Sequence, residues 1–304
     1  MAFTCYVEKK FHKKSLVLIE YINMIISEYA EQGYTLTLRQ VYYQLVSRDM
    51  IENNERSYKN IGSLINDGRL AGLIDWDAIE DRTRMLRGNV HWDSPADIIE
   101  ATAKQYHTNL WTAQSYHVEV WVEKDALVEV IGIAARKFDV DYFSCRGYTS
   151  QSEMHSAARR LKYWQNKGKE IAILHLGDHD PSGIDMSRDI VERLSFFGVD
   201  VEFQRLALNF DQIEEYNPPP NPAKMTDPRS LGYIDIYGRS SWELDALDPS
   251  IIDRLITSNV EKYIDVPMFE KAVERQEEER TILEDMSIYY SDIAKAIAIA
   301  KSRA

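Results

Sequence analysis

The chain has 304 residues, of which 44% are hydrophobic, and it carries a formal net charge of −13. This length and composition are sufficient for a sizeable buried core and suggest two domains. The negative charge argues against a protein that coats nucleic acid through bulk positive potential. Local basic groups remain near the N-terminus and further along, at Lys9, Lys10, Lys13, Lys14, Arg82, Arg84 and Arg87.

Two cysteines, Cys5 and Cys145, are too few for a disulfide framework or a zinc site. A bound metal would therefore need oxygen or imidazole ligands. The apolar stretches fall short of the roughly 20 residues that span a bilayer. The N-terminus lacks the apolar region of a secretory signal. We expect a cytoplasmic protein without a membrane partner.

The first part of the chain shows helical periodicity. Thr37 and Gln40 have the spacing of a capping box, which marks the start of a helix. Helices are predicted at residues 15–31, 37–49 and 56–72. Three short helices followed by the stretch 76–87 are typical of a winged-helix DNA-binding domain. We place this domain at residues 1–112.

From residue 117 the pattern changes to alternating strands and helices. Such alternation predicts an α/β domain with a mostly parallel sheet covered on both faces, in which ligands gather at the carboxyl ends of the strands. We place this domain at residues 113–304, with a helical C-terminal extension from residue 251. The predicted strands are 117–122, 140–143, 171–176 and 199–203, and the predicted helices are 126–137, 151–165 and 183–197.

Two aspartates follow the apolar strand 171–176. Asp178 and Asp180 are two residues apart, so they point the same way if the segment is extended, and Pro181 suits the first turn of the next helix. Carboxylate oxygens are the ligands that Mg²⁺ and Mn²⁺ prefer. The motif is compatible with a metal site, but by itself it is a weak signal. The alternative is a solvated turn or a helix cap.

Glu123 ends the alternating strand 117–122. A parallel sheet would bring this strand end beside Asp178. Three acids at one edge favour a divalent-metal site over a chance turn. The alternative for Glu123 is a carboxylate at a helix N-terminus, favoured by the helix dipole, or one paired on the surface with Lys124.

A glutamate that ends one strand, followed within about a hundred residues by Asp-x-Asp-Pro-x-Gly at the end of another, resembles the toprim domain of topoisomerases and toprim nucleases. With a winged-helix domain in front, the chain is similar to the A subunit of type IIB topoisomerases (topoisomerase VI). The resemblance covers most of the chain. It implies that Glu123, Asp178 and Asp180 bind Mg²⁺ or Mn²⁺ and that Glu123 also serves catalysis.

This family carries its nucleophile as the second aromatic residue of an Arg-x-x-Tyr-Tyr-like motif, which matches Arg39 to Tyr43 here. On the predicted helix, Tyr42 belongs to the apolar stripe, whereas Tyr43 lies on the polar face near Arg39 and is expected to be accessible. The resemblance implies that Tyr43 attacks a phosphodiester with help from Arg39. The alternative is an amphipathic tyrosine half-buried between domains.

We therefore expect a Mg²⁺-dependent enzyme that breaks, and on reversal rejoins, double-stranded DNA by tyrosine transesterification. The resemblance also implies a homodimer and, for ATP-driven strand passage, a separate ATPase B subunit, because the chain has no nucleotide-binding motif. Two alternatives share the fold. One is a hydrolytic toprim nuclease that uses the same acids, and the other is a non-catalytic DNA-binding module.

Other polar groups carry weaker signals. Glu243 and Asp245 either support the metal or cap the next helix. Lys224 and Arg229 either contact phosphate or belong to a solvated loop. Arg82 and Arg84 are equally compatible with surface ion pairs. His179 lies between the aspartates, points away from them if the segment is extended, and is not expected to be a ligand.

Overall fold

The computed structural model describes residues 3–79 and 91–302. The chain forms two compact units. Unit 1 combines Met1–Arg84 with Val118–Lys262, and unit 2 combines Met85–His117 with Tyr263–Ala304. The sequence predicts a domain boundary between residues 112 and 113, and this boundary stays a prediction.

The N-terminal part of unit 1 contains the three predicted helices. The capping box is confirmed, because the Thr37 hydroxyl accepts from the Gln40 amide at 3.3 Å while the Gln40 side chain accepts from the Thr37 amide at 2.8 Å. Only the beginning of the stretch 76–87 falls within the described residues, with a bridge between Leu36 and Ile79. The helices are α1 (Lys13–Glu31), α2 (Leu38–Ser47) and α3 (Glu55–Leu70).

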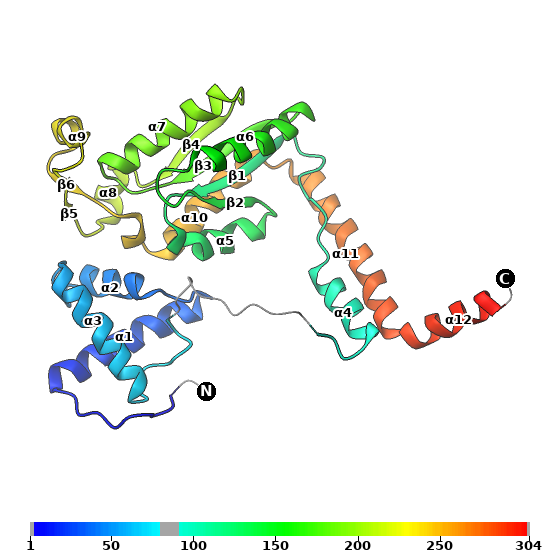
Figure 1. The fold of residues 1–304 in the computed structure, drawn as a ribbon, viewed down its shortest axis with the longest axis horizontal. Coiled ribbons are helices and arrows are strands. Elements are labelled where there is room, and N and C mark those ends of the chain that lie inside the picture. The colour runs from blue at the N-terminus through cyan, green and yellow to red at the C-terminus, as the bar shows by residue number, and fades with distance from the viewer. Residues whose placement is uncertain (1–2, 80–90, 303–304) are drawn as a thin grey trace. The chain divides into compact units, whose positions relative to one another are not determined.

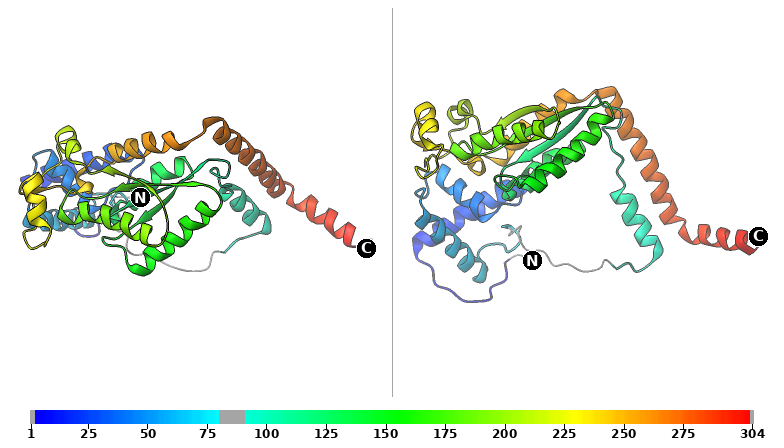
Figure 2. Two further views of the ribbon diagram at one scale, coloured as in Figure 1. Left: turned by 90° about the horizontal axis from the view of Figure 1, so that it is seen from above. Right: turned by 45° about the horizontal axis from the view of Figure 1, so that its top comes forward.

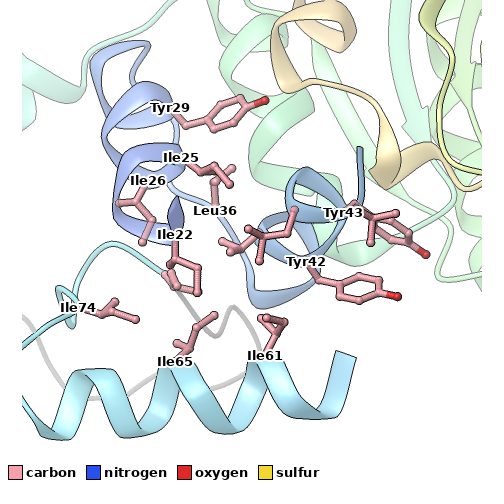
Figure 3. Packing of buried hydrophobic residues seen from close by; sticks show 14 of the residues in the cluster. Ile22, Ile25, Ile26, Tyr29, Leu36, Tyr42, Tyr43, Ile61, Ile65 and Ile74 are labelled. Carbon is pink, nitrogen blue, oxygen red and sulfur yellow. The ribbon is translucent and has the colours of Figure 1, made fainter. Parts of the chain in front are cut away.

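Isoleucines and tyrosines of these helices form one apolar cluster (Figure 3). The helices supply apolar residues at helical spacing, so burying this face drives their packing. Ala246, far along the chain, joins the cluster. Figure 3 shows Tyr42 and Tyr43 projecting from α2 on the side away from Ile25 and Ile26.

The rest of unit 1 is the predicted α/β fold around a four-stranded parallel sheet of order β2-β1-β3-β4 (Figure 1). Helices α6 and α7 cover one face, and α5 and α10 cover the other (Figures 1 and 2). The elements are β1 (Tyr116–Val122), η1 (Asp125–Leu127), α5 (Val128–Lys137), β2 (Asp141–Ser144), α6 (Gln151–Asn166), β3 (Glu170–Leu176), α7 (Pro181–Phe196), β4 (Glu202–Ala207) and α10 (Pro249–Val260).

The predicted strand 199–203 was placed too early. Val199 packs in the core beneath the end of α7, where its amide bonds to the Leu194 carbonyl at 3.0 Å, and the sheet pairing begins only at Glu202. Its apolar character therefore reflects helix-end packing.

Between β4 and α10 the chain makes an irregular excursion, as the run of prolines predicts. It returns to the sheet edge through a bridge in which the His179 and Trp242 amides each donate to the other's carbonyl, at 2.8 and 3.0 Å. The elements are α8 (Phe210–Tyr216), β5 (Asn221–Pro222), α9 (Ser230–Tyr237), β6 (Ser240–Ser241) and η2 (Leu244–Ala246).

Unit 2 is helical, which confirms the predicted helical C-terminus. Its first helix packs against the long one, and the Tyr106 hydroxyl donates to Glu279 at 2.5 Å. Within the described ranges, no helix has the length and hydropathy that crossing a membrane requires. The elements here, with the short turn that ends unit 1, are η3 (Glu261–Tyr263), α4 (Pro95–Gln105), α11 (Val266–Ile288) and α12 (Tyr290–Ser302).

Candidate active site

Glu123 and Asp178 lie side by side at the carboxyl edge of the sheet. The strands β1 and β3 are neighbours, and the Glu123 amide donates to the Leu176 carbonyl at 2.9 Å. The Asp178 amide in turn donates to Glu123 Oε2 at 2.9 Å. Both side chains are buried, with 8% and 6% exposed. The expectation that parallel topology brings these two acids together is confirmed.

Asp180 begins helix α7. Its Oδ1 accepts from the Gly183 amide at 2.7 Å and from the Ser182 hydroxyl at 2.9 Å, with Pro181 at the first helical position. Asp180 therefore caps the helix through its Oδ1 oxygen, which is one of the alternatives that the sequence left open. The cap turns the chain so that the helix N-terminus faces the sheet edge, where its dipole stabilises negative charge.

Gly183 brings the two sides of this site into close contact. A Cβ placed on it would lie 2.3 Å from the Asp178 carbonyl oxygen and 3.1 Å from Glu123 Oε2. No side chain fits at such a distance. The fourth position of the Asp-Pro-Ser-Gly tail thus needs glycine for a steric reason, because only a residue without a side chain lets the first turn of α7 approach both acids.

The donor set fits a hard divalent cation, since Glu123, Asp178 and Asp180 offer only carboxylate oxygens. One oxygen of Glu123 and one oxygen of Asp180 are each fixed by a backbone amide. The three acids do not present a set of oxygens that all lie within 4.8 Å of one another in the described structure.

Burial and mutual repulsion perturb the acids. Burial raises the pKa of Glu123, and the charge of Asp178 adds to the rise. Burial also raises the pKa of Asp178, which the ammonium of Lys124 opposes. A cation at this edge would favour the ionised form of both groups.

Lys124 is the centre of an ion-pair network that sequence reasoning missed. Its Nζ lies 2.9 Å from Asp178 Oδ2, 2.8 Å from Glu243 Oε2 and 2.7 Å from Asp245 Oδ1. The Leu244 amide donates to Asp178 Oδ1 at 2.8 Å and so places Glu243 and Asp245 beside the lysine. The only signal in the sequence was the adjacency of Lys124 to Glu123.

Glu243 and Asp245 do not cap the next helix. Asp248 does so, accepting from the Ser250 amide at 2.8 Å. Burial alone would raise the pKa of Glu243, but Lys124 and Arg39 lower it to about 2. Both acids therefore serve the ion-pair network.

Arg39 belongs to the same network. It pairs with Glu243, and its Nε lies 2.7 Å from Asp245 Oδ2. Its guanidinium carbon lies 5.7 Å from the centre of the Tyr43 ring. A continuous chain of contacts thus runs from Tyr43 through Arg39, the two acids and Lys124 to Asp178.

Tyr42 is a core residue, as predicted, but the expectation that Tyr43 is accessible is wrong. Tyr43 is only 4% exposed. The face of α2 that looks polar in isolation is covered by the η2 segment. Burial raises the pKa of the Tyr43 phenol to about 12, with Glu243 adding to the rise and Arg39 opposing it.

The remaining predicted residues lie elsewhere. His179 points away from the aspartates, as expected, and its Nδ1 lies 2.7 Å from the Tyr233 hydroxyl. Arg229 pairs with Asp227 and Asp185, and Lys224 is exposed. Arg82, Arg84 and Arg87 lie outside the described residues.

Comparison with family models and with curated proteins gave no match.

Proposed function

We propose that the chain breaks phosphodiester bonds of double-stranded DNA with the help of Mg²⁺, with Tyr43 as the nucleophile. The observation that carries the proposal is the contact between Glu123 and Asp178 at the carboxyl ends of adjacent parallel strands. Ligands of α/β sheets bind at this edge. The sequence resemblance to the A subunit of type IIB topoisomerases gives the substrate class.

Glu123, Asp178 and Asp180 would hold the ion, which supplies positive charge to the phosphate as negative charge develops there. Mn²⁺ has the same preference for oxygen ligands. The Tyr43 oxygen forms a bond to phosphorus while the bond from phosphorus to one deoxyribose oxygen breaks. The phenol proton passes to solvent, and the departing oxygen takes up a proton from solvent. Arg39, beside the phenol, favours its ionised form.

The wider arrangement follows from the same proposal. The three N-terminal helices would act as a winged-helix domain that holds DNA, and the parallel sheet would be a toprim domain. A homodimer would bring a second tyrosine to the second strand, and a separate ATPase subunit would drive strand passage.

A hydrolytic nuclease is the second candidate, and the burial of Tyr43 favours it. A phenol that is 4% exposed, with a pKa of about 12, is a weak nucleophile in this conformation. In this reading the same acids orient water, which attacks phosphorus, and Tyr43 packs α2 against the η2 segment.

The test is an adduct assay with plasmid DNA in Mg²⁺ or Mn²⁺. Transesterification predicts a protein-DNA adduct that Tyr43→Phe abolishes and Tyr42→Phe retains. Tyr42 is the matched control, because its hydroxyl bonds to Asn53 Oδ1 at 2.9 Å outside the ion-pair network. Free ends and an unaffected Tyr43→Phe variant would instead support hydrolysis. Binding without cleavage in either metal would contradict both and indicate a DNA-binding module.

A further inference from the structure

Arg205 on β4 reaches the loop that carries the aspartates. Its Nη2 donates to the carbonyls of Gly177 at 3.0 Å and Asp178 at 2.6 Å. Its Nη1 donates to the Gly183 carbonyl at 3.0 Å and to the Ser187 hydroxyl at 2.6 Å. One guanidinium thus joins the end of β3 to the first turns of α7.

These bonds lie on both sides of the segment from Asp178 to Asp180. The Gly177 carbonyl also accepts from the Leu208 amide at 2.7 Å, whereas Arg205 is the described donor to the Asp178 carbonyl. Leaving a buried carbonyl unpaired costs about 1–3 kcal/mol. The planar fork of arginine can serve several acceptors at once, which the single nitrogen of lysine cannot do in the same geometry. Arg205 therefore fixes the backbone course from which both aspartate side chains project.

The described contacts of Arg205 are to carbonyls and a hydroxyl, and none is a hydrogen bond to a carboxylate. Burial lowers the pKa of Arg205, while Glu123, Asp178 and Asp180 oppose that shift and favour the charged guanidinium. Arg205 thus lies next to the acidic edge without donating to the carboxylate oxygens that a metal would use.

We infer that Arg205 is a positioning residue for the candidate metal centre and sets its affinity by holding the Gly177–Gly183 backbone. This inference rests on the proposed function, because it assumes that the acids bind a divalent cation. Partners that orient metal ligands typically change metal affinity about 10- to 100-fold when they are replaced.

The experiment is a Mn²⁺ titration of the full chain, in which electron paramagnetic resonance measures the concentration of the free ion. Arg205→Met and Arg205→Lys are both expected to raise the Kd for Mn²⁺ at least about ten-fold. Arg69→Lys is the matched control, since the guanidinium of Arg69 on α3 also donates to two backbone carbonyls, those of Trp76 and Ile79. It should leave the Kd unchanged.

Backbone hydrogen exchange without metal gives a second readout. Faster exchange at the amides of residues 177–180, 182 and 183, with the core strands still protected, is the expected result for both Arg205 variants. If Arg205→Met does not fold, Arg205→Lys carries the test. Loss of protection throughout the sheet in Arg205→Lys would overturn the inference, because Arg205 would then support the whole fold.

The outcomes separate the two proposals. A wild-type chain that binds no Mn²⁺ contradicts the proposed function. If the wild-type chain binds Mn²⁺ and both Arg205 variants bind it equally tightly, the result contradicts only the positioning role. Full affinity in Arg205→Lys alone would also contradict it, because charge without the fork would then be sufficient.

Discussion

At the scale of single residues, the candidate site depends on how closely backbone and side chains approach. Gly183 is the sharpest case, since its Cα faces the Asp178 carbonyl and the Glu123 carboxylate. Backbone cannot yield as a flexible side chain does. The site is therefore sensitive to a single methyl group.

We expect Gly183→Ala to lower the free energy of unfolding by about 1–3 kcal/mol, through overpacking against the Asp178 carbonyl. Divalent-metal binding should weaken with it. Gly232→Ala is the control, because its added Cβ would meet nothing within 4 Å on α9. Urea unfolding of both variants measures the effect. Equal stability of Gly183→Ala and the wild type would contradict the described approach.

His175 is a buried histidine on β3, and it makes stability depend on pH. Burial, with a contribution from Arg205, lowers its pKa from 6.5 to about 3. Between these values the unfolded chain binds a proton that the folded chain excludes. The stability is therefore fully present above about pH 6.5 and is lost as the pH falls toward 3.

From pH 7 to about pH 5, His175 should account for about 2 kcal/mol of lost stability. Comparing the wild type with His175→Gln by urea unfolding at both pH values isolates this contribution from that of other groups. The wild type should lose more stability than the variant. Equal losses would show that His175 is protonated in the folded chain or already neutral in the unfolded one.

At the scale of elements, helix α2 is covered on two sides. Its apolar stripe packs on α1 and α3, and its other face meets the η2 segment, where Arg39 pairs with Glu243 and Asp245. The ion pairs hold α2 to the excursion that follows β4. Exposure of Tyr43 to DNA therefore requires this contact to open.

We expect Asp245→Asn to destabilise the chain by about 1–3 kcal/mol, because it leaves Arg39 and Lys124 with one charged partner fewer in a partly buried network. The Asp245 side chain is 1% exposed. Nitration of Tyr43 should become faster in this variant. Mass spectrometry of the nitrated peptide measures the rate.

Glu129→Gln is the control for this experiment. Glu129 pairs with Arg136 at 3.3 Å on the exposed face of α5, where an ion pair contributes about 0–1 kcal/mol. If Asp245→Asn and Glu129→Gln have the same stability and the same Tyr43 nitration rate, the network does not hold α2 in place.

The sequence predicted what depends on local pattern. The capping box at Thr37 and the contact of Glu123 with Asp178 followed from short motifs and from the rule that parallel strands end at one edge. The pattern missed the covering of Tyr43 and the network around Lys124. Both depend on Leu244, which bonds to Asp178 from 66 residues away. Helical periodicity indicates the apolar face of a helix that packs in the core. It does not indicate that a distant segment covers the polar face as well.

At the scale of the whole molecule, charge is the main constraint on the proposed activity on DNA. The net charge of −13 opposes the approach of DNA. Some of the acidic residues lie on α11 in unit 2, namely Glu274, Glu277, Glu278, Glu279 and Glu284. The proposed binding of DNA would therefore rest on local contacts and on divalent cations at the acidic edge.

We propose that the acids at the sheet edge enable DNA cleavage. The most direct measurement is conversion of supercoiled plasmid in Mg²⁺ or Mn²⁺ by the Asp178→Asn, Asp180→Asn double variant. Asparagine keeps the helix cap and removes the charge. We predict that the wild type and the control Asp265→Asn, at the cap of α11, cleave and that the folded double variant does not. Full cleavage by the double variant would contradict the account.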